Sequence, residues 1–363
     1  MVSVPRSGRA QLDSTFLSRL SIHGYLTLGY GISGAEPQLG LPTDGSVDYD
    51  RAALLGQFAL ASHSHLVVQV AHRDLGTENS LFNEPTFILD WAYFEQRFGD
   101  NTRLRVGQEP LPIGIYNEIR YVGTLLPFYR APYTTYSEGS YTQENLQGLV
   151  FTQTIEPHGM FPVDFNAWAG QYNYAEKGTV TVNGASTTAS VPATAHNVVG
   201  SWIWVRTPLD GFRFGGGIMH YVPEGGVTEQ VLGKSDETDS YASVDATFDR
   251  FQVRSELSHA LRSGGKLNST QGYAQVGVKV IDPLTLNAQL ELQHVHYAVA
   301  PGYAANADLQ HDFGFGADVA LPWSAVFKLE GHATRGYDYD TNPSVFGPPT
   351  KGSYGIASLA FIF

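Results

Sequence analysis

Hydrophobic and polar residues alternate with a period of two along most of this chain, and that pattern limits the fold more than any other feature. Between Leu286 and Gln293, leucine and alanine alternate with asparagine, glutamine and glutamate. The same pattern recurs in Ala242–Phe248 and in Ala325–His332. Each such strand has one apolar face and one face whose charges and amides suit water better than a packed core.

The alternating segments predict about sixteen strands, an even number that lets the first and last strands pair. They span residues 20–33, 51–61, 65–74, 86–98, 102–111, 147–156, 159–172, 194–207, 212–223, 240–248, 251–262, 271–281, 284–298, 308–321, 324–335 and 352–363. The last of these ends on Phe363, and aromatic residues are typical of the lipid–water boundary.

Short and long connections alternate between these strands. The short ones, such as Asp249–Arg250 and Asp282–Pro283, are tight turns. The long ones are 34–50, 75–85, 112–146, 173–193, 224–239, 263–270, 299–307 and 336–351. Short turns on one rim and long loops on the other predict an all-β fold, a transmembrane antiparallel meander β-barrel, rather than a soluble sandwich or propeller.

Composition agrees with this fold class and excludes several functions. The 363 residues include 39 Gly, 20 Tyr and 20 Phe, which suit strands and turns rather than long helices. No stretch approaches the roughly 18 apolar residues of a transmembrane helix. The absence of cysteine excludes disulfides and thiolate metal sites. The net charge of −13 argues against a nucleic-acid partner.

Two regions divide the chain. Residues 1–19 lack the continuous apolar stretch of a signal peptide, so we expect a mature exported chain with an added Met1 and a periplasmic N-terminal segment at 1–19. Residues 20–363 are expected to form a single barrel domain. Segments 87–94 and 198–205 are apolar on both faces, which fits packing by an inward-folded loop or a subunit interface.

The longest connection, 112–146, is too apolar for a loop surrounded by water, because Ile113, Ile115 and Phe128 favour burial. We therefore predict that this long third loop folds into the lumen and narrows it. Its few charges have mixed sign, and charges facing a constriction select solutes. Glu109 lies where the loop begins, and Arg103 and Arg105 lie on the expected inner face next to its base. These three residues are candidates for the pore constriction.

A resemblance adds to this interpretation. The stretch Arg105–Arg120 reads Arg-Val-Gly-Gln-x-x-x-Pro-Ile-Gly-Ile-Tyr-Asn-Glu-x-Arg and resembles a segment of Gram-negative outer-membrane porins of the phosphate-selective O/P and DcaP-like type. The sixteen-strand plan with a terminal Phe resembles the wider class of trimeric porins. By this resemblance, the candidate constriction residues also include Tyr116, Glu118, Arg120 and Arg130.

The resemblance implies ion transport and passive diffusion of small hydrophilic solutes through a homotrimer in the bacterial outer membrane, with lipid and lipopolysaccharide as neighbours. The place of Arg120 and Arg130 in the apolar loop adds a prediction. If both line the constriction, changing them to Ser raises conductance and shifts selectivity towards cations. Because inner-face charges of both signs occur, no strong ion preference follows. The alternatives are a plugged barrel that anchors a surface layer or a partner, and a barrel enzyme acting on lipid or peptide.

No motif assigns a cofactor, a metal or a catalytic residue. The chain lacks a Gly-x-Ser-x-Gly elbow, a His-Glu-x-x-His helix and a phosphate-binding loop. His63 and His65, and likewise His294 and His296, have a spacing that can hold a metal, but neither pair has a third clustered ligand. A role at a turn or at the membrane boundary is the favoured interpretation of both pairs.

Overall fold

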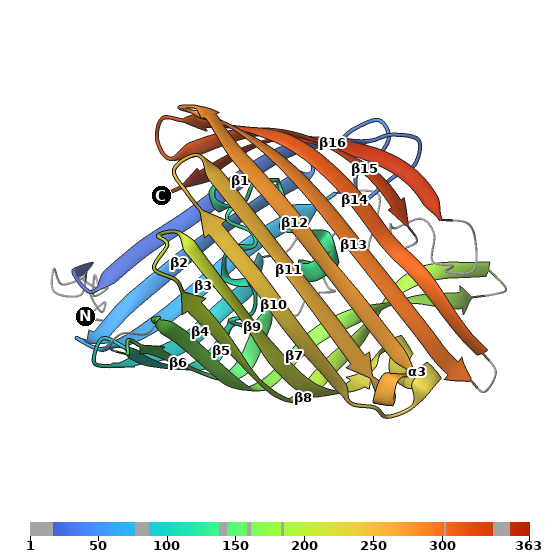
Figure 1. The fold of residues 1–363 in the computed structure, drawn as a ribbon, viewed down its shortest axis with the longest axis horizontal. Helices are drawn as coiled ribbons and strands as arrows, with labels where there is room; N and C mark the ends of the chain where they lie inside the picture. Colours follow the sequence, from blue (N-terminus) through green and yellow to red (C-terminus); the bar gives the residue numbers. More distant parts are fainter. Residues whose placement is uncertain are drawn as a thin grey trace, which may run out of the picture.

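The computed structural model describes residues 17–76, 87–137, 144–157, 161–182, 185–300, 303–336 and 349–363. In these residues, sixteen strands form one closed barrel in which each strand pairs with its neighbours in sequence (Figure 1). The first strand, β1, pairs antiparallel with the last, β16, and so closes the sheet. The predicted all-β antiparallel meander barrel is confirmed.

The element bounds are as follows. The strands are β1 (Leu20–Ser33), β2 (Tyr49–Ala61), β3 (Ser64–Leu75), β4 (Phe87–Phe98), β5 (Thr102–Pro110), β6 (Asn145–Ile155), β7 (Val163–Val182), β8 (Ala185–Arg206), β9 (Phe212–Gly225), β10 (Glu237–Thr247), β11 (Phe251–Arg262), β12 (Leu267–Ile281), β13 (Leu284–Ala300), β14 (Tyr303–Leu321), β15 (Ala325–Gly336) and β16 (Thr350–Ile362). The short helices are η1 (Asn117–Ile119), η2 (Gly123–Leu125), α2 (Tyr133–Tyr136), α3 (Gly226–Leu232) and η4 (Ser263–Gly265).

The alternation in sequence becomes an inside and an outside. On β1, Thr27 is 1% exposed whereas the next residue, Leu28, is 47% exposed. Leu54 on β2 and Leu290 on β13 likewise lie on the apolar outer face. Closure gives every strand two hydrogen-bonded neighbours, and an unpaired backbone group in hydrocarbon would cost several kcal/mol. Such a barrel is suited to a surrounding lipid phase.

Several expected loops are shorter than predicted because the strands continue into them. Residues 173–182 and 185–193, predicted as a loop, belong to β7 and β8. The sequence of these segments is rich in small and β-branched residues, which suit extended backbone. Most of 299–307 is strand, and 224–239 contains α3. β12 already begins at Leu267, inside the predicted loop 263–270.

Other sequence-based expectations have different outcomes. Most of the expected periplasmic segment 1–19 and of the loop 336–351 lies outside the described residues. The two-sided apolar strand β8 packs inward, since Val198 and Trp202 belong to a buried cluster with Ile113 and Tyr116. Among the described residues, no helix has the length and apolar character needed to cross a membrane.

Candidate channel constriction

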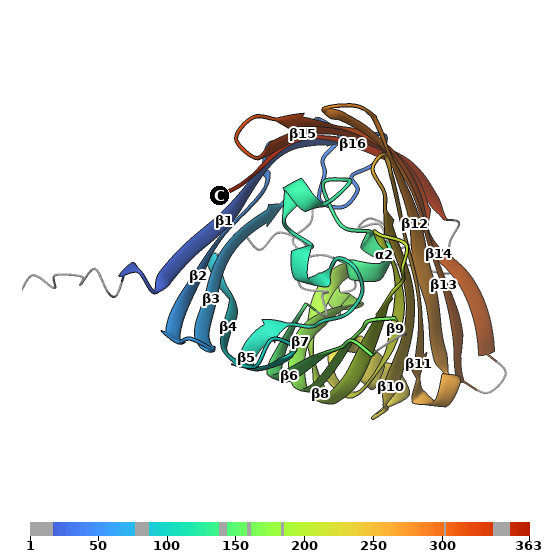
Figure 2. The same ribbon diagram turned by 60° about the vertical axis from the view of Figure 1, so that its left-hand side comes forward.

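The connection between β5 and β6 is here called the third loop (residues 111–144). Its described residues 111–137 lie within the ring of strands in Figure 2. The sequence predicted it at 112–146, and residues 138–143 are outside the described part. The loop turns at Gly114, where φ is +65° and a Cβ atom would meet the Tyr136 hydroxyl and the Glu256 carboxylate. Only glycine fits a left-handed position as crowded as this one.

Glu256 on β11 holds the first part of the third loop. Its carboxylate accepts hydrogen bonds from the Ile115 N–H (3.1 Å), from the Tyr273 hydroxyl (2.6 Å) and from the Tyr136 hydroxyl. Burial, together with this carboxylate, raises the pKa of Tyr136 well above its ordinary value. The phenol therefore stays protonated and donates to the carboxylate.

Tyr116 and Thr134 extend this attachment along β11–β13. The Tyr116 hydroxyl donates to Gln275 on β12 and accepts from Nη1 of Arg254 at 3.0 Å. The Thr134 N–H donates to Glu291 on β13 at 2.7 Å. Each bond satisfies a buried polar group that would otherwise be costly to desolvate. This wall of the barrel therefore fixes the loop at several points.

The opposite part of the third loop is attached to strands on both sides of the β1–β16 seam. Nη1 of Arg51 on β2 donates to the Tyr129 carbonyl oxygen at 3.0 Å, and its guanidinium carbon lies 4.1 Å from the centre of the Tyr129 ring. The Tyr129 N–H donates to Glu330 on β15 at 2.6 Å. Lys328 donates to the Leu126 carbonyl oxygen. A cation over an aromatic face and charged hydrogen bonds stabilise this contact.

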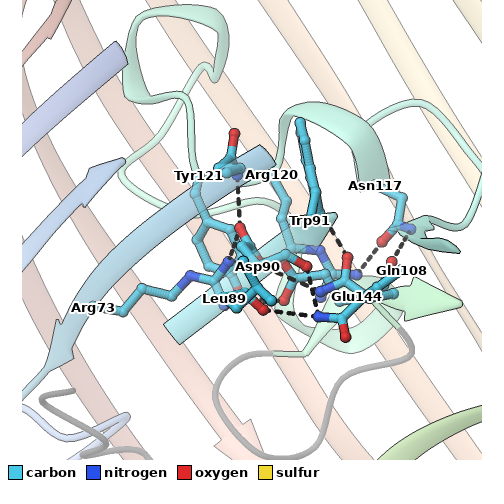
Figure 3. A network of polar contacts seen from close by, with 11 residues as sticks. Arg73, Leu89, Asp90, Trp91, Gln108, Asn117, Arg120, Tyr121 and Glu144 are labelled. Carbon is cyan, nitrogen blue, oxygen red and sulfur yellow. Dashed lines mark hydrogen bonds and ion pairs between the residues drawn. The ribbon is translucent and has the colours of Figure 1, made fainter. Parts of the chain in front are cut away.

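A buried arginine with two carboxylates joins the end of the third loop to the barrel wall; we call Arg73, Asp90 and Glu144 the base triad (Figure 3). Nη2 of Arg73 lies 2.8 Å from Asp90 and 2.8 Å from Glu144. The three side chains are 11%, 0% and 8% exposed. Burial raises the pKa of the Glu144 carboxyl, and Arg73 opposes this shift. The two acids share one cation in a dry site.

Asn117 connects the base triad to the start of the loop. Its Nδ2 donates to the carbonyl oxygens of Leu111 (2.7 Å) and Glu144 (3.1 Å), and its Oδ1 accepts from Arg120 (Figure 3). The Leu111 N–H donates to the Glu144 carbonyl oxygen at 3.0 Å. The two ends of the loop are thereby tied together next to β4.

A second arginine with two carboxylates lies nearer the β5 side of the lumen; we call Arg105, Glu95 and Glu118 the cavity triad. Nε of Arg105 lies 3.2 Å from Glu95 on β4, and its Nη1 lies 3.2 Å from Glu118 on η1. The side chains of Arg105 and Glu95 are 12% and 6% exposed, whereas Glu118 is 50% exposed. This ion pair therefore reaches water at its loop end.

Arg105 and Glu118 of the cavity triad line a cavity of about 200 Å³ between the third loop and β5–β9. Charged groups of both signs line it: Arg103, Arg105, Glu118, Asp164 and Arg213. The guanidinium carbon of Arg213 also lies 4.3 Å from the centre of the Trp204 ring. The polar groups of such a lining can replace water molecules around a passing solute.

The structure separates the seven residues that the sequence proposed. Arg103, Arg105 and Glu118 come together at this cavity. The other four are buried: Glu109 and Tyr116 are 0% exposed, Arg120 is 4% exposed and Arg130 is 2% exposed. Arg130 lies 5.4 Å from the Tyr49 ring, so it packs against the β2 wall.

Sequence reasoning missed the groups that hold the loop. Arg73, Asp90, Glu144, Glu256 and Glu330 were not singled out for this role. Alternation places Arg73, Glu256 and Glu330 on the inner face. It therefore predicts that these side chains face the lumen, but it does not predict which residues they contact. The contacts of Arg73, Glu256 and Glu330 with the third loop join residues 71, 141 and 201 positions apart in sequence, a separation that periodicity does not resolve.

The histidine pairs lie away from this cavity. His294 and His296 on β13 contact Asp308 and Asn306 on β14 through Nδ1, at 2.9 and 2.8 Å. His63 lies in the turn between β2 and β3, next to His65 on β3. In the described ranges, no three or more His, Asp or Glu side chains gather in a way that could hold a metal ion.

Comparison with solved structures supports a class of protein. The chain is similar to OmpF of Salmonella typhi in complex with daunomycin, with 9% identity, 95% and 97% coverage of the two chains and a TM-score of 0.65. It is similar to the outer membrane channel DcaP of Acinetobacter baumannii, with 9% identity, the same coverage and a TM-score of 0.64. A trimer form of OmpT, an outer membrane protein of Vibrio cholerae, matches with 12% identity, 95% and 99% coverage and a TM-score of 0.57.

At these identities the likeness shows the fold, a porin-like barrel of the outer-membrane type. No family model matches the chain, and no curated protein matches it. The resemblance to the phosphate-selective O/P type stays a prediction.

Proposed function

We propose that this protein is a channel of the bacterial outer membrane through which small hydrophilic solutes or ions diffuse passively, without catalysis. One observation carries the proposal. The barrel is apolar outside, while Arg103, Arg105 and Glu118 face a cavity beside the third loop. The likeness to a protein described as an outer membrane channel supports it.

The narrowest part of the path would run between the third loop and β5–β9. There the cavity lining includes three guanidinium groups, of Arg103, Arg105 and Arg213, and two carboxylates, of Glu118 and Asp164. Because the signs nearly balance, we propose weak ion selectivity with a slight preference for anions. The buried residues Glu109, Tyr116, Arg120 and Arg130 would act indirectly, by setting the position of the loop.

Planar-bilayer recording tests the channel. Purified protein should produce stable conductance steps, and the reversal potential under a salt gradient should report a weak preference for anions. A protein that inserts into the bilayer without steps would contradict the proposal.

We further propose a homotrimer in contact with outer-membrane lipid and lipopolysaccharide, with residues 1–19 on the periplasmic side. The trimer form of a similar barrel supports this assembly. The outer face of β4, where Phe87 is 80% exposed and Leu89 is 54% exposed, offers an apolar surface for a second copy. Conductance steps in groups of three and a trimer mass in detergent are expected; a monomer mass would contradict the assembly alone.

A plugged barrel that anchors a surface layer or a partner is the second candidate. The attachment of the third loop to β2, β11, β13 and β15 favours it, because a loop held at so many points fills much of the lumen. Correctly inserted protein with no conductance would support this function. Hydrolysis of lipid or peptide by the purified protein would instead support an enzyme.

A further inference from the structure

A furrow runs along the outer face of the barrel at β12. Gly272 and Ala274 lie on this face, and their register partners on β13 are Leu292 and Leu290. On the other side, Gly272 pairs with Leu257 of β11. Small residues between larger ones leave a groove of about 600 Å³, here called the furrow, whose leucine walls are 44–56% exposed. β11, β12 and β13 run across the front of Figure 1.

Polar residues replace the leucines at the long-loop end of the furrow. Thr270, the next outward position on β12, pairs in register with His294, which contacts Asp308 through Nδ1 at 2.9 Å. His311 on β14 is the register partner of Leu292 and lies 4.0 Å from Asp308. The other ring nitrogen of His294, Nε2, is not used in this contact and is available to a ligand.

Two cationic residues follow His311 in register around the barrel. His311 pairs with Arg335 on β15, and Arg335 pairs with Lys351 on β16. Arg335 and Lys351 are both exposed. We call His294, His311, Arg335 and Lys351 the basic band. Two cations and two imidazoles beside an apolar furrow match a molecule with an anionic head and a hydrocarbon tail.

We propose that the furrow and the basic band bind a phosphorylated glycolipid of the lipid A class, with one acyl chain in the furrow and a phosphate at the band. The band lies at the long-loop rim, which is the extracellular rim of such barrels. Lipopolysaccharide occupies that leaflet, and its phosphates complement the cations in charge. The proposal rests on the outer-membrane placement but not on conductance.

Native mass spectrometry of the full chain in detergent tests the site. The protein is titrated with bis-phosphorylated lipid A, dephosphorylated lipid A or phosphatidylglycerol. Bis-phosphorylated lipid A should bind most tightly. Arg335→Gln/Lys351→Gln should weaken its binding about tenfold, the scale of one lost charge-assisted contact. Ala274→Leu, which fills the furrow with an apolar side chain, should weaken all three lipids.

Arg250→Gln is the matched control, since Arg250 is exposed in the short turn at the opposite rim. It should bind lipid A as the wild type does. Equal binding of dephosphorylated lipid A or of phosphatidylglycerol would overturn the choice of ligand. If Ala274→Leu binds the lipids as the wild type does, the furrow is not a lipid site. A change in oligomer mass in this variant would also contradict a lipid site there. Wild-type conductance is recorded on the same preparation. A lack of conductance there would contradict the channel proposal and would leave the lipid site unaffected.

Discussion

The base triad and the cavity triad contain the same groups in different surroundings. In each, one arginine lies between two carboxylates, and one carboxylate belongs to β4 and the other to the third loop. In the base triad the Arg73 contacts are 2.8 Å and the loop carboxylate, Glu144, is 8% exposed. In the cavity triad the Arg105 contacts are 3.2 Å and Glu118 is 50% exposed.

This difference shows that burial decides what a lumen charge does. A dry ion pair is strongly destabilised when one partner is removed, because the other charge stays buried and unpaired. A wet ion pair contributes little to stability, but its charges act on any ion that passes nearby. We therefore propose that the base triad anchors the loop and that the cavity triad takes part in solute selection.

The largest effect is expected from Arg73→Ala. Asp90 and Glu144 would then be buried without their cation, which costs about 3–5 kcal/mol. The midpoint of urea unfolding in detergent or lipid should fall. The end of the third loop should also detach, so single-channel current should fluctuate more.

Arg97→Ala is the control for this change, because Arg97 contacts Glu95 at 2.7 Å but is 44% exposed. Its effect on the unfolding midpoint should be small. If the two substitutions lower the unfolding midpoint equally, burial does not set the contribution of these ion pairs to stability.

The next effect concerns selectivity. Arg103→Ser/Arg105→Ser removes two cations from the cavity, while Arg97 stays next to Glu95. Conductance should rise, and the ratio of cation to anion permeability should increase by a factor of about two to three, the scale of a weakly screened charge in water. Reversal potentials under a salt gradient measure this ratio.

Arg120→Ser/Arg130→Ser is the informative comparison. Both arginines are at most 4% exposed. The double variant should give unsteady current through a loosened loop and little change in reversal potential. If it shifts selectivity more than Arg103→Ser/Arg105→Ser does, the buried arginines line the path and the assignment above is wrong.

A smaller effect is expected from pH. Burial raises the pKa of Glu144 above its ordinary value of 4.5, so the folded state binds a proton more readily than the unfolded state. The stabilisation from the protonated form is complete below pH 4.5 and is lost as pH rises through the raised pKa. Glu144→Gln should flatten this part of the curve of unfolding free energy against pH. If the slope of unfolding free energy against pH is unchanged in the variant, Glu144 is not the source of this pH dependence.

The sequence was sufficient for the barrel because a period of two is a local property. Thr27 and Leu28 are neighbours in the chain and face opposite sides of the sheet, as alternation requires. The ends of β7 and β8 were missed because the sequence there, with many Ser, Thr and Ala residues, gives a weak alternation signal. The two strands nevertheless pair in register.

The site was less accessible to sequence reasoning. Arg103 and Arg105 were proposed because they lie next to the loop on an inner face, and both line the cavity. The pairing of Arg73 with Glu144 was not found, because the two residues are brought together by barrel closure and loop packing. Glu118 and Arg120 are two residues apart, yet one is half exposed and the other is buried. Only the packing of η1 distinguishes them.

The smallest effect is expected from Glu118→Gln. The side chain is half exposed, so its ion pair with Arg105 contributes only about 0.2–1 kcal/mol to stability. The unfolding midpoint should hardly move. The reversal potential should still shift slightly towards anions, because Arg105 loses a compensating charge at the mouth of the cavity. High salt should reduce that shift, since counterions screen exposed charges. A large loss of stability would instead mean that the cavity triad is as dry as the base triad.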